Sequence, residues 1–256
     1  MCSAHAAPWP QTPAPLTYIP GIPYGEADGM PLLLDILCPH APPGRPLPTV
    51  VHIHGGGWEA GDRFGGNAPQ WNPLFAANGF LVASISYRLS GQAPFPAQIH
   101  DAKAAVRWLR ANAARYGVDP ERIGACGHSA GGHLATLLGV TDDLPELEGN
   151  GSSPGVSSRV RAVVGVSTPT DFLGRGGLMI NDAASPVTRL FGGTVHERAD
   201  PMRLASSLYH VHPSGAPIPP MLLIHGMEDE IVPVDQSALL RGPARGRRRR
   251  HLHPPP

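Results

Sequence analysis

Short apolar runs bounded by glycine and proline, which alternate with helical patterns, constrain the fold of this chain more than any other feature. Each run has the length and composition of a β-strand, and the runs lie at 16–24, 32–37, 49–53, 80–87, 123–126, 160–167 and 221–225. Helices are predicted at 97–116, 130–138 and 235–240. Strands separated by helices are typical of a mostly parallel sheet with helices on both faces. The sequence therefore predicts an α/β fold.

The helix predicted over 97–116 has the clearest pattern in the chain. Its apolar residues recur at helical spacing, and Gly117 is a suitable stop after its last turn. The residues that form this apolar face are Ile99, Ala102, Ala105, Val106 and Leu109. We expect the charged residues of this helix to lie mostly on its other side, namely Asp101, Lys103, Arg107 and Arg110.

Length and composition indicate a single domain. The chain has 256 residues, 41% of them hydrophobic, which is enough for one sizeable core. We expect this domain to span 16–240, after a disordered Pro/Ala-rich lead-in over 1–15. The weakly periodic segment 169–220 is predicted to form a small cap over the sheet. An Arg/Pro-rich tail follows at 241–256.

The formal net charge of zero hides an asymmetry. Six of the 20 basic residues lie in the last 16 positions, which hold no acid, so residues 1–240 carry 14 basic against 20 acidic residues. A body with this balance has no reason to bind phosphate backbones, and the arginines of the tail would give only salt-sensitive, sequence-independent contacts. We therefore expect no nucleic-acid partner.

Cysteine usage and hydropathy bear on the compartment. Three cysteines, at 2, 38 and 126, are an odd number in a chain long enough to fold without disulfides. The first fifteen residues have no basic start or long apolar core of a signal peptide, and no 18 apolar residues run together. The prediction is a cytoplasmic protein with no membrane partner.

The pattern G-x-S-x-G, which is typical of serine nucleophiles, occurs twice. Ser129 lies in GHSAG, which follows one predicted strand and precedes a predicted helix. This context fits a nucleophile elbow, a strained turn that lifts the serine oxygen clear of the sheet. Ser153 lies in GSSPG, which follows no strand, and Pro154 would remove a backbone N–H that such a site needs. We therefore predict Ser129 as the nucleophile and Ser153 as a surface loop residue.

A second glycine-rich turn, HGGGW at 54–58, follows the strand predicted at 49–53. Successive glycines let backbone N–H groups approach a ligand closely, as an oxyanion hole requires. We predict that Gly55 and Gly56 form this hole together with the N–H of Ala130. Taken alone, the turn is also compatible with a flexible loop or an anion-binding nest.

The strand predicted at 221–225 runs into an acidic segment, HGMEDEIVPVDQS. A carboxylate beyond the carboxyl end of a parallel strand lies at the same sheet edge as the elbow. Asp229 is the predicted acid of a catalytic triad. Its neighbours Glu228, Glu230 and Asp235 are expected to be solvated acids of the loop and of the next helix.

Together these stretches resemble a known family. HIHGGGWEAGD, GACGHSAGGHLA, STPTDF, SPVTRL and HGMEDEIVPVDQS resemble the α/β-hydrolase superfamily, in the esterase branch of the hormone-sensitive-lipase-like and acetyl-xylan/feruloyl-esterase-like enzymes. The resemblance covers the chain from about Tyr24 to Leu240. It implies Ser129 as nucleophile, Asp229 as triad acid and the HGGGW loop in the oxyanion hole.

The chemistry implied by this resemblance is hydrolysis of a small carboxylic ester through an acyl-enzyme, with no cofactor and no metal. Short-chain, acetyl or feruloyl-type esters are the expected substrates. Amide, formamide or peptide hydrolysis on the same site is the alternative reaction. A hydrolase-fold protein that binds a ligand or partner without catalysis is the alternative from another class. The sequence gives no indication of oligomeric state.

The histidine of the triad is the unresolved member of the predicted site. The order in this fold is serine, acid, histidine, and the histidine normally follows one more strand after the acid. From residue 241 onward no apolar alternation or strand is visible, and only His251 and His253 remain. We take His253 as the candidate base, with His251 as the alternative. We expect a frameshifted or truncated hydrolase end that lacks the last strand and helix and whose activity is impaired.

The other histidines predict no metal site. His52 and His54 alternate along a strand, His210 and His212 lie in a proline-rich segment, and no HExxH motif is present. A further four are interpreted as packing or hydrogen-bonding residues, namely His100, His128, His133 and His225.

Overall fold

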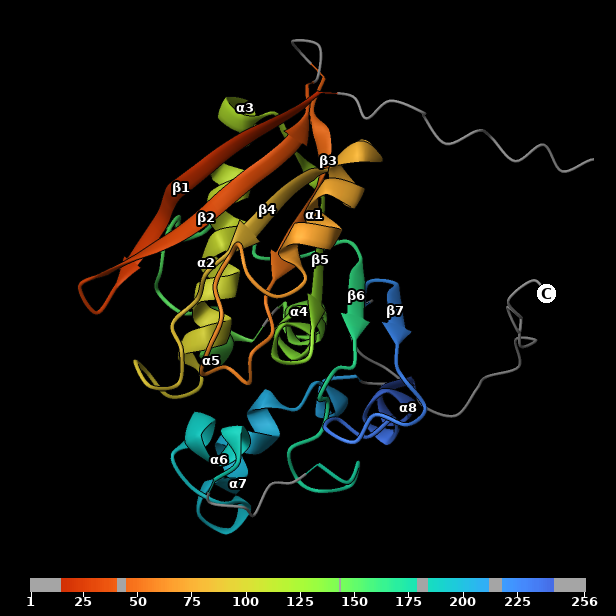
Figure 1. Cartoon of the computed structure of the whole chain (residues 1–256). Coiled ribbons are helices and arrows are strands. Elements are labelled where there is room, and N and C mark those ends of the chain that lie inside the picture. Colours follow the sequence, from red (N-terminus) through yellow and green to blue (C-terminus); the bar gives the residue numbers. More distant parts are fainter. Residues whose placement is uncertain (1–14, 41–44, 143, 179–183, 212–217, 242–256) are drawn as a thin grey trace, which may run out of the picture.

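The computed structural model describes residues 15–40, 45–142, 144–178, 184–211 and 218–241 (Figure 1). They form a seven-stranded sheet in the order β1-β2-β4-β3-β5-β6-β7. The strands are β1 (Leu16–Ala27), β2 (Met30–Pro39), β3 (Leu47–Ile53), β4 (Leu81–Ile85), β5 (Val118–His128), β6 (Val163–Val166) and β7 (Met221–Ile224). The pairs β1–β2 and β2–β4 are antiparallel and the other four are parallel. The predicted α/β-hydrolase fold is confirmed.

Helices cover both faces of the sheet. Contacts of α2 (Ala97–Ala111) and α4 (Ala130–Val140) place them on one face, against β5 and each other. On the other face α1 (Ala68–Ala77) contacts β2, β3 and β4. The remaining helices are α3 (Ala113–Tyr116), α5 (Pro145–Glu148), α6 (Pro186–Phe191), α7 (Val195–Ala205), the 3-10 turn η1 (Ser207–Tyr209) and α8 (Asp235–Arg241). Figure 1 shows α6, α7 and α8 below the carboxyl ends of β5, β6 and β7.

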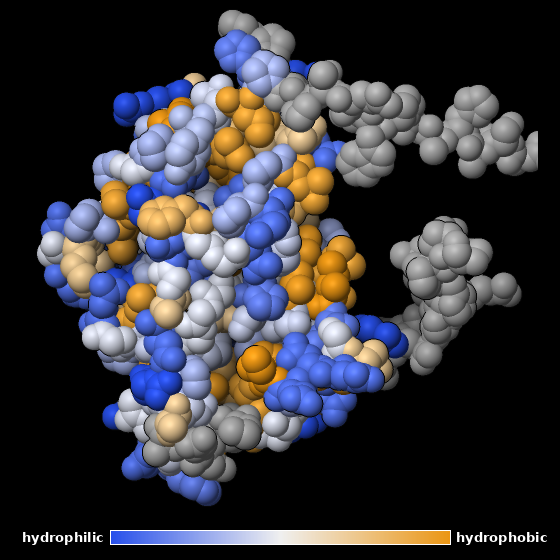
Figure 2. All heavy atoms as spheres, in the orientation of Figure 1, coloured by the Kyte–Doolittle hydropathy of each residue, from blue (hydrophilic) through white to orange (hydrophobic). Residues whose placement is uncertain are grey.

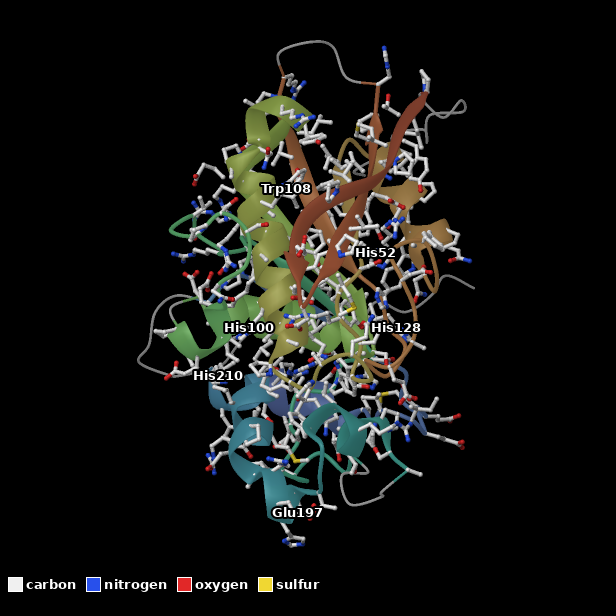
Figure 3. The ribbon with its side chains drawn as sticks, turned by 90° about the vertical axis from the view of Figure 1, so that its left-hand side faces the viewer. His52, His100, Trp108, His128, Glu197 and His210 are labelled. Atoms are coloured by element: carbon white, nitrogen blue, oxygen red, sulfur yellow. The ribbon has the colours of Figure 1, made fainter. Side chains whose placement is uncertain are left out.

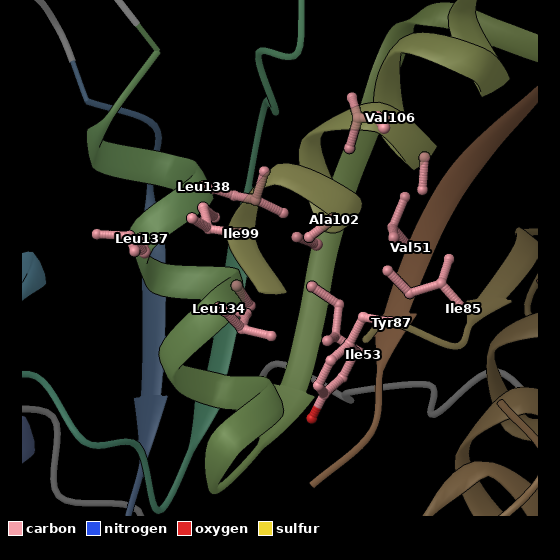
Figure 4. Packing of buried hydrophobic residues seen from close by; sticks show 14 of the residues in the cluster. Val51, Ile53, Ile85, Tyr87, Ile99, Ala102, Val106, Leu134, Leu137 and Leu138 are labelled. Carbon is pink, nitrogen blue, oxygen red and sulfur yellow. The ribbon is translucent and has the colours of Figure 1, made fainter. Parts of the chain in front are cut away.

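The main core lies between the sheet and the pair α2 and α4 (Figure 4). Val51 and Ile53 of β3 face Ile99 of α2 and Leu134 of α4, and all four side chains are fully buried. Burying each such side chain contributes about 1.5–3 kcal/mol. This packing fixes β3 and β5 against α4, the three elements that carry the predicted elbow and glycine turn.

The register of β3 and β5 brings two distant parts of the sequence together. Ile53 pairs with Gly127 in the parallel ladder, so both strands end at the same level. The HGGGW turn and Ser129, about 75 residues apart in the chain, therefore emerge side by side at one edge of the sheet.

All seven predicted strands are present, and the structure adds the helices α1, α5, α6 and α7 to the predicted ones. The helix expected over 97–116 is divided at Asn112, and Gly117 ends it in the left-handed conformation, at φ 71°. The helix α1 is not predicted, because its apolar pattern is weak. It buries only Ala68 and Ala76 and contains Pro73.

Three of the charged residues expected on the other side of α2 are covered by other parts of the chain. Asp101, Lys103 and Arg107 are buried. Asp101 accepts hydrogen bonds from Arg88, at 2.7 Å for the shortest. Lys103 and Arg107 both form ion pairs with Glu148, at 2.9 and 2.5 Å. The reason is tertiary, since α5 and the loop after it cover this side of the helix and supply the partner carboxylate.

Within the described residues, no helix has the length and hydropathy needed to cross a membrane. The predicted lead-in and tail lie outside the described residues, apart from their inner ends at 15 and 241.

Candidate active site

Ser129 stands in a sharp turn between β5 and α4. Its backbone has φ 54° and ψ −121°, a strained combination for a residue with a side chain, and its N–H donates to the carbonyl of Val166 at 2.8 Å. A Cβ on Gly131 would overlap the carbonyl oxygen of Ile53, and one on Gly127 would overlap the backbone of Gly131. Both glycines of the motif are therefore required by close backbone contact. The turn has the geometry predicted for a nucleophile elbow.

The HGGGW turn lies directly beside this serine. A Cβ placed on Gly55 would stand 3.5 Å from the Cβ of Ser129. Gly56 has φ 115°, where a side chain would be strained, and a Cβ there would overlap Ala60. The N–H groups of Gly55, Gly56 and Ala130 donate to no acceptor among the described residues. Three spare backbone donors thus adjoin the serine, as an oxyanion hole requires.

A buried hydrogen-bond chain fixes the far side of this turn. The indole nitrogen of Trp58 donates to Nδ1 of His133 at 3.1 Å, and Nε2 of His133 donates to the carbonyl of Ala205 at 2.8 Å. Complete burial lowers the pKa of His133 to about 4, so the ring is neutral near pH 7. These hydrogen bonds connect the glycine turn with α4, the helix that follows Ser129, and with α7. Beyond the residue types of Trp58 and His133, no sequence pattern indicates these hydrogen bonds.

An ion pair also connects the glycine turn to α6. Arg189 donates from Nε and Nη2 to the two carboxylate oxygens of Glu59, at 2.5 and 3.0 Å. Both side chains are partly exposed, so this pair contributes at most about 1 kcal/mol. Its two hydrogen bonds join α6 to the residue that follows the turn.

Asp229 lies in the loop between β7 and α8 and is held by backbone donors. Its Oδ1 accepts from the N–H groups of Ile231 and Val232, at 3.0 and 2.9 Å. Partial burial raises the pKa of Asp229, but hydrogen bonds from Val232, Ser167 and Ile231, with a smaller effect of His225, outweigh it and leave the pKa below its usual value. The carboxylate is therefore charged near pH 7.

The acids near Asp229 have a different environment. Glu228, Glu230 and Asp235 are exposed, as expected for solvated acids, and Asp235 begins α8. Among these four carboxylates, Asp229 alone accepts the two backbone hydrogen bonds of the loop. Asp229 thus differs from its three neighbours in its hydrogen bonds, and its role as the triad acid stays a prediction.

His225 supports the loop that carries this acid. Its Nε2 donates to the carbonyl of Val232 at 2.6 Å, and its Nδ1 accepts from the hydroxyl of Ser237 at 2.7 Å. Nε2 also lies 3.6 Å from Oδ2 of Asp229. Both ring nitrogens are thus engaged, and the ring connects the two ends of the loop.

His128 lies at the lower edge of the sheet, above α6 and α7 (Figure 3). Its Nδ1 would stand 3.4 Å from a Cβ on Gly55, so the half-buried ring packs against the glycine turn. Burial lowers its pKa, while the nearby charge of Asp229 opposes this. The two halves of the site, around Ser129 and around Asp229, therefore meet at His128.

The predicted base lies outside this arrangement. The Oγ of Ser129 makes no hydrogen bond with any residue that the structure describes, histidines included. His251 and His253 are outside the described residues. The structure thus brings Ser129 together with Gly55, Gly56 and Ala130, and leaves the assignment of the base as a prediction.

Ser153 lies elsewhere in the molecule. Its loop precedes β6 without a strand before it or a helix after it, and a Cβ on Gly151 would touch Ala104 of α2. The loop therefore packs on α2, away from the carboxyl edge of β3 and β5. This placement agrees with the prediction of a surface loop residue.

Other histidines have protein partners. Nδ1 of His52 contacts Oδ1 of Asn72 at 2.7 Å, and Nδ1 of His54 donates to the carbonyl of Gly55 at 2.7 Å. Burial lowers the pKa of His52 to about 4. Nε2 of His210 donates to the carbonyl of Leu204 at 2.8 Å, and His212 lies outside the described residues. In the described ranges, no three His, Cys, Asp or Glu side chains are grouped as metal ligands would be.

Comparison with known proteins identifies similar esterases. The BD-FAE family model matches residues 34–243. Esterase LipC of Mycobacterium tuberculosis is 32% identical over 214 residues, which are 80% of this chain and 50% of LipC. The chain spans about half the length of the curated relatives it matches.

Solved structures agree with this similarity. The truncated form of a carbohydrate esterase from gut microbiota is 32% identical, with a TM-score of 0.77 over 88% of this chain and 82% of that one. The propionate-bound esterase Est2 from Thermogutta terrifontis is 29% identical, with a TM-score of 0.68 over 89% of this chain and 77% of that one.

Proposed function

Because this chain belongs to the BD-FAE family of α/β-hydrolase-fold esterases, we propose that it hydrolyses carboxylic esters with Ser129 as the nucleophile. The observation that carries this proposal is the strained turn of Ser129, at φ 54°, beside three backbone N–H groups with no acceptor among the described residues. Backbone strain of this kind costs about 1–3 kcal/mol and is retained where function uses it.

The proposed reaction has two acyl-transfer steps. A base takes the proton of Ser129 Oγ as this oxygen forms a bond to the ester carbonyl carbon. The N–H groups of Gly55, Gly56 and Ala130 stabilise the negative charge on the carbonyl oxygen. The bond to the alcohol oxygen then breaks, and the base returns its proton to the departing alcohol. Water repeats the sequence on the acyl-enzyme and releases the acid.

Asp229 is the proposed triad acid, because it is charged and held by backbone donors at the same sheet edge. Its role is to orient and stabilise the protonated base. His253, with His251 as the alternative, is the proposed base from the tail. In subtilisin, loss of the catalytic histidine lowers kcat by about 10⁶-fold. Turnover by this chain therefore depends on whether one of these two rings reaches Ser129.

Esters of small acids are the proposed substrates. Est2 binds propionate in its solved structure, and a second structural neighbour is a carbohydrate esterase. Acetyl, other short-chain and feruloyl esters of sugars are therefore the first compounds to compare. Amide or peptide hydrolysis on the same site is the alternative reaction.

Covalent labelling tests the proposal directly. A fluorophosphonate probe should label the full chain on Ser129, and Ser129→Ala should abolish the label. Ser153→Ala is the matched control, since it removes the second G-x-S-x-G serine and should leave labelling unchanged. Labelling that survives Ser129→Ala and is lost in Ser153→Ala would overturn the assignment. The variants His251→Ala and His253→Ala then show which ring, if either, activates the nucleophile.

A further inference from the structure

The loop that carries the second G-x-S-x-G serine takes no part in the proposed site, but it contains a chemically labile pair of residues. The chain has two Asn-Gly pairs, Asn150-Gly151 in this loop and Asn78-Gly79 at the end of α1. Asparagine is a heat-labile residue, and glycine after it leaves the backbone nitrogen open to the side-chain amide, because glycine has no Cβ. The sequence treats these two pairs alike.

Water, the second reactant of asparagine hydrolysis, reaches both positions, since Asn78 and Asn150 are both exposed. Figure 2 shows mainly hydrophilic side chains on the left-hand side of the molecule, the side on which α5 lies in Figure 1. Exposure therefore does not distinguish the two pairs, and their hydrogen bonds must be compared.

Asn78 is held by the end of α1. It is the C-cap residue, with φ −95° and ψ 17°, and its Nδ2 donates to the carbonyl of Leu74 at 2.8 Å. The N–H of Gly79 donates to the carbonyl of Ala76 at 3.0 Å. Both the amide that would be attacked and the nitrogen that would attack it are thus engaged in the helix cap, and both bonds must open before they can react.

Asn150 lies in a bend just after α5 and has no such restraint. Its side chain forms no hydrogen bond with a residue that the structure describes, and neither does the N–H of Gly151. The side-chain carbon and the backbone nitrogen can therefore meet by rotation within one exposed residue. The structure thus separates two pairs that are identical in sequence.

We propose that Asn150 is a site of spontaneous deamidation. The backbone nitrogen of Gly151 attacks Cγ of Asn150, so a new C–N bond forms as the bond from Cγ to Nδ2 breaks. The proton of the Gly151 N–H leaves with the amide nitrogen as ammonia, and a five-membered succinimide remains. Water then opens one of the two ring carbonyls, which gives either aspartate or isoaspartate at position 150. The reaction needs no oxidant and no group from elsewhere in the chain.

The segment around Asn150 holds a buried cation on both sides of the modified residue. Arg107 is 2% exposed, and its Nη1 donates to the carbonyl and to Oε1 of Glu148, at 2.8 and 2.5 Å. Its Nε donates to the carbonyl of Ser152 at 3.0 Å. The length of main chain between Glu148 and Ser152 therefore has to match the shape of one guanidinium group.

Isoaspartate changes that length, because it adds one methylene group to the main chain between residues 150 and 151. The added atom has little room, since a Cβ on Gly151 would stand 2.9 Å from the Cβ of Ala104 in α2. We expect the longer segment to release Arg107 at one of its ends, which leaves a buried charge with fewer partners. Deamidation at Asn150 should therefore destabilise the packing of this loop on α2.

Peptide mapping of the full chain after incubation in mildly alkaline buffer tests the proposal. Residues 123–159 form a tryptic peptide whose only asparagine is Asn150, and residues 64–88 form the one that contains Asn78. The first peptide should gain the mass of an amide-to-acid exchange at least about tenfold faster, because two hydrogen bonds must open first at Asn78. In concentrated urea, which removes these bonds, the two peptides should convert at similar rates. Methylation by an isoaspartate methyltransferase identifies the isoaspartate product.

Asn150→Gln is the blocking variant, because its longer side chain would have to close a less favourable six-membered ring, and Asn78→Gln is the matched control. After the incubation, the wild type and Asn78→Gln should each unfold at a lower temperature than before it, whereas Asn150→Gln should not change. Asn150→Asp carries the new charge without the longer main chain, so it should unfold as the fresh wild type does.

Equal conversion of the two peptides in the folded chain, or an Asn150 that stays intact, would overturn the proposed site. Isoaspartate at position 150 with unchanged thermal unfolding, or Asn150→Asp as unstable as the incubated wild type, would overturn the proposed effect on Arg107. None of these outcomes depends on esterase activity.

Discussion

The two halves of the candidate site rest on different supports. Ser129 and Gly55 follow β5 and β3, which are central strands with neighbours on both sides and helices packed against them. Asp229 follows β7, a four-residue strand at the edge of the sheet with a half-exposed Leu222. The proposed nucleophile and its proposed oxyanion donors are therefore fixed by the core, whereas the proposed acid is fixed by a few local hydrogen bonds.

This difference in support explains why the backbone strain lies at Ser129. The turn of Ser129 carries about 1–3 kcal/mol of backbone strain, which persists only where the surroundings over-determine it. The contacts of Gly127 and Gly131 with the backbone around them supply that constraint. The Asp229 loop is held by hydrogen bonds that contribute about 1 kcal/mol each. We expect the two halves to respond very differently to substitution.

The largest effect is expected at Gly131. In Gly131→Ala the new Cβ would overlap the carbonyl oxygen of Ile53, so the elbow and the end of β3 must separate. We expect a loss of more than about 3 kcal/mol in the free energy of unfolding, together with loss of Ser129 labelling. Urea denaturation followed by circular dichroism measures the first effect.

Gly91→Ala is the matched control, because a Cβ there would meet no heavy atom within 4 Å. Its free energy of unfolding should stay within about 0.5 kcal/mol of the wild type. If the two alanine variants were equally stable, the elbow would not be held by the core, and the contrast between the two halves would fail.

The second-largest effect is the pH dependence of the free energy of unfolding that we expect from His133, in the core half of the site. The pKa of His133 is about 4 in the folded protein, against 6.5 when unfolded, because the neutral ring is buried. Its contribution to stability is complete above pH 6.5 and is lost as pH falls toward 4, since only the unfolded chain takes up the proton in this range. The loss is about 3 kcal/mol for this ring. Urea denaturation at several pH values between 4 and 7 measures it.

His133→Gln should remove this share of the pH dependence and leave that of His52, whose pKa is also about 4. Trp58→Phe removes the hydrogen-bond donor but leaves His133 buried, so it should lower stability at every pH without flattening the slope. A slope unchanged by His133→Gln would contradict the assignment of a buried neutral ring.

Sequence reasoning reached the core half of the site because its signals are local. The strand, the small residues around Ser129 and the helix that follows are contiguous, as are the glycines of HGGGW. Parallel strands then bring the two segments to one edge without further information. The same rule predicted that Asp229 lies at this edge of the sheet. The backbone N–H groups that bond to it depend on a loop conformation, which no periodic sequence pattern encodes.

The contacts that the sequence did not indicate join residues far apart in the chain. Trp58 and His133 are 75 residues apart and meet only through the packing of α4 on the sheet. The sequence pattern placed Lys103 and Arg107 on the charged side of α2, but it did not identify Glu148 of α5 as their partner. The tertiary structure determines which partner a buried polar group has. The residue types alone therefore do not predict these hydrogen bonds and ion pairs.

The smallest effect is expected in the edge half of the site, at His225. His225→Ala removes the hydrogen bonds to Val232 and Ser237 that connect the two ends of the Asp229 loop. We expect a loss of about 1–3 kcal/mol in the free energy of unfolding, below that of Gly131→Ala. Because the loop lies on an edge strand, the change should stay local. Hydrogen exchange should quicken in β7 and α8 and remain unchanged in β3 and β5.

His100→Ala is the matched control for this prediction. His100 also bonds a backbone carbonyl, that of Glu146 at 3.1 Å, but it belongs to α2 and has no contact with the Asp229 loop. Its substitution should leave exchange in β7 and α8 as in the wild type. If His225→Ala quickened exchange equally in β5 and β7, the two halves would open as one unit. The separation between a proposed nucleophile fixed by the core and a proposed acid held by a local loop would then be wrong, and the edge strand would belong to the same cooperative structure as the elbow.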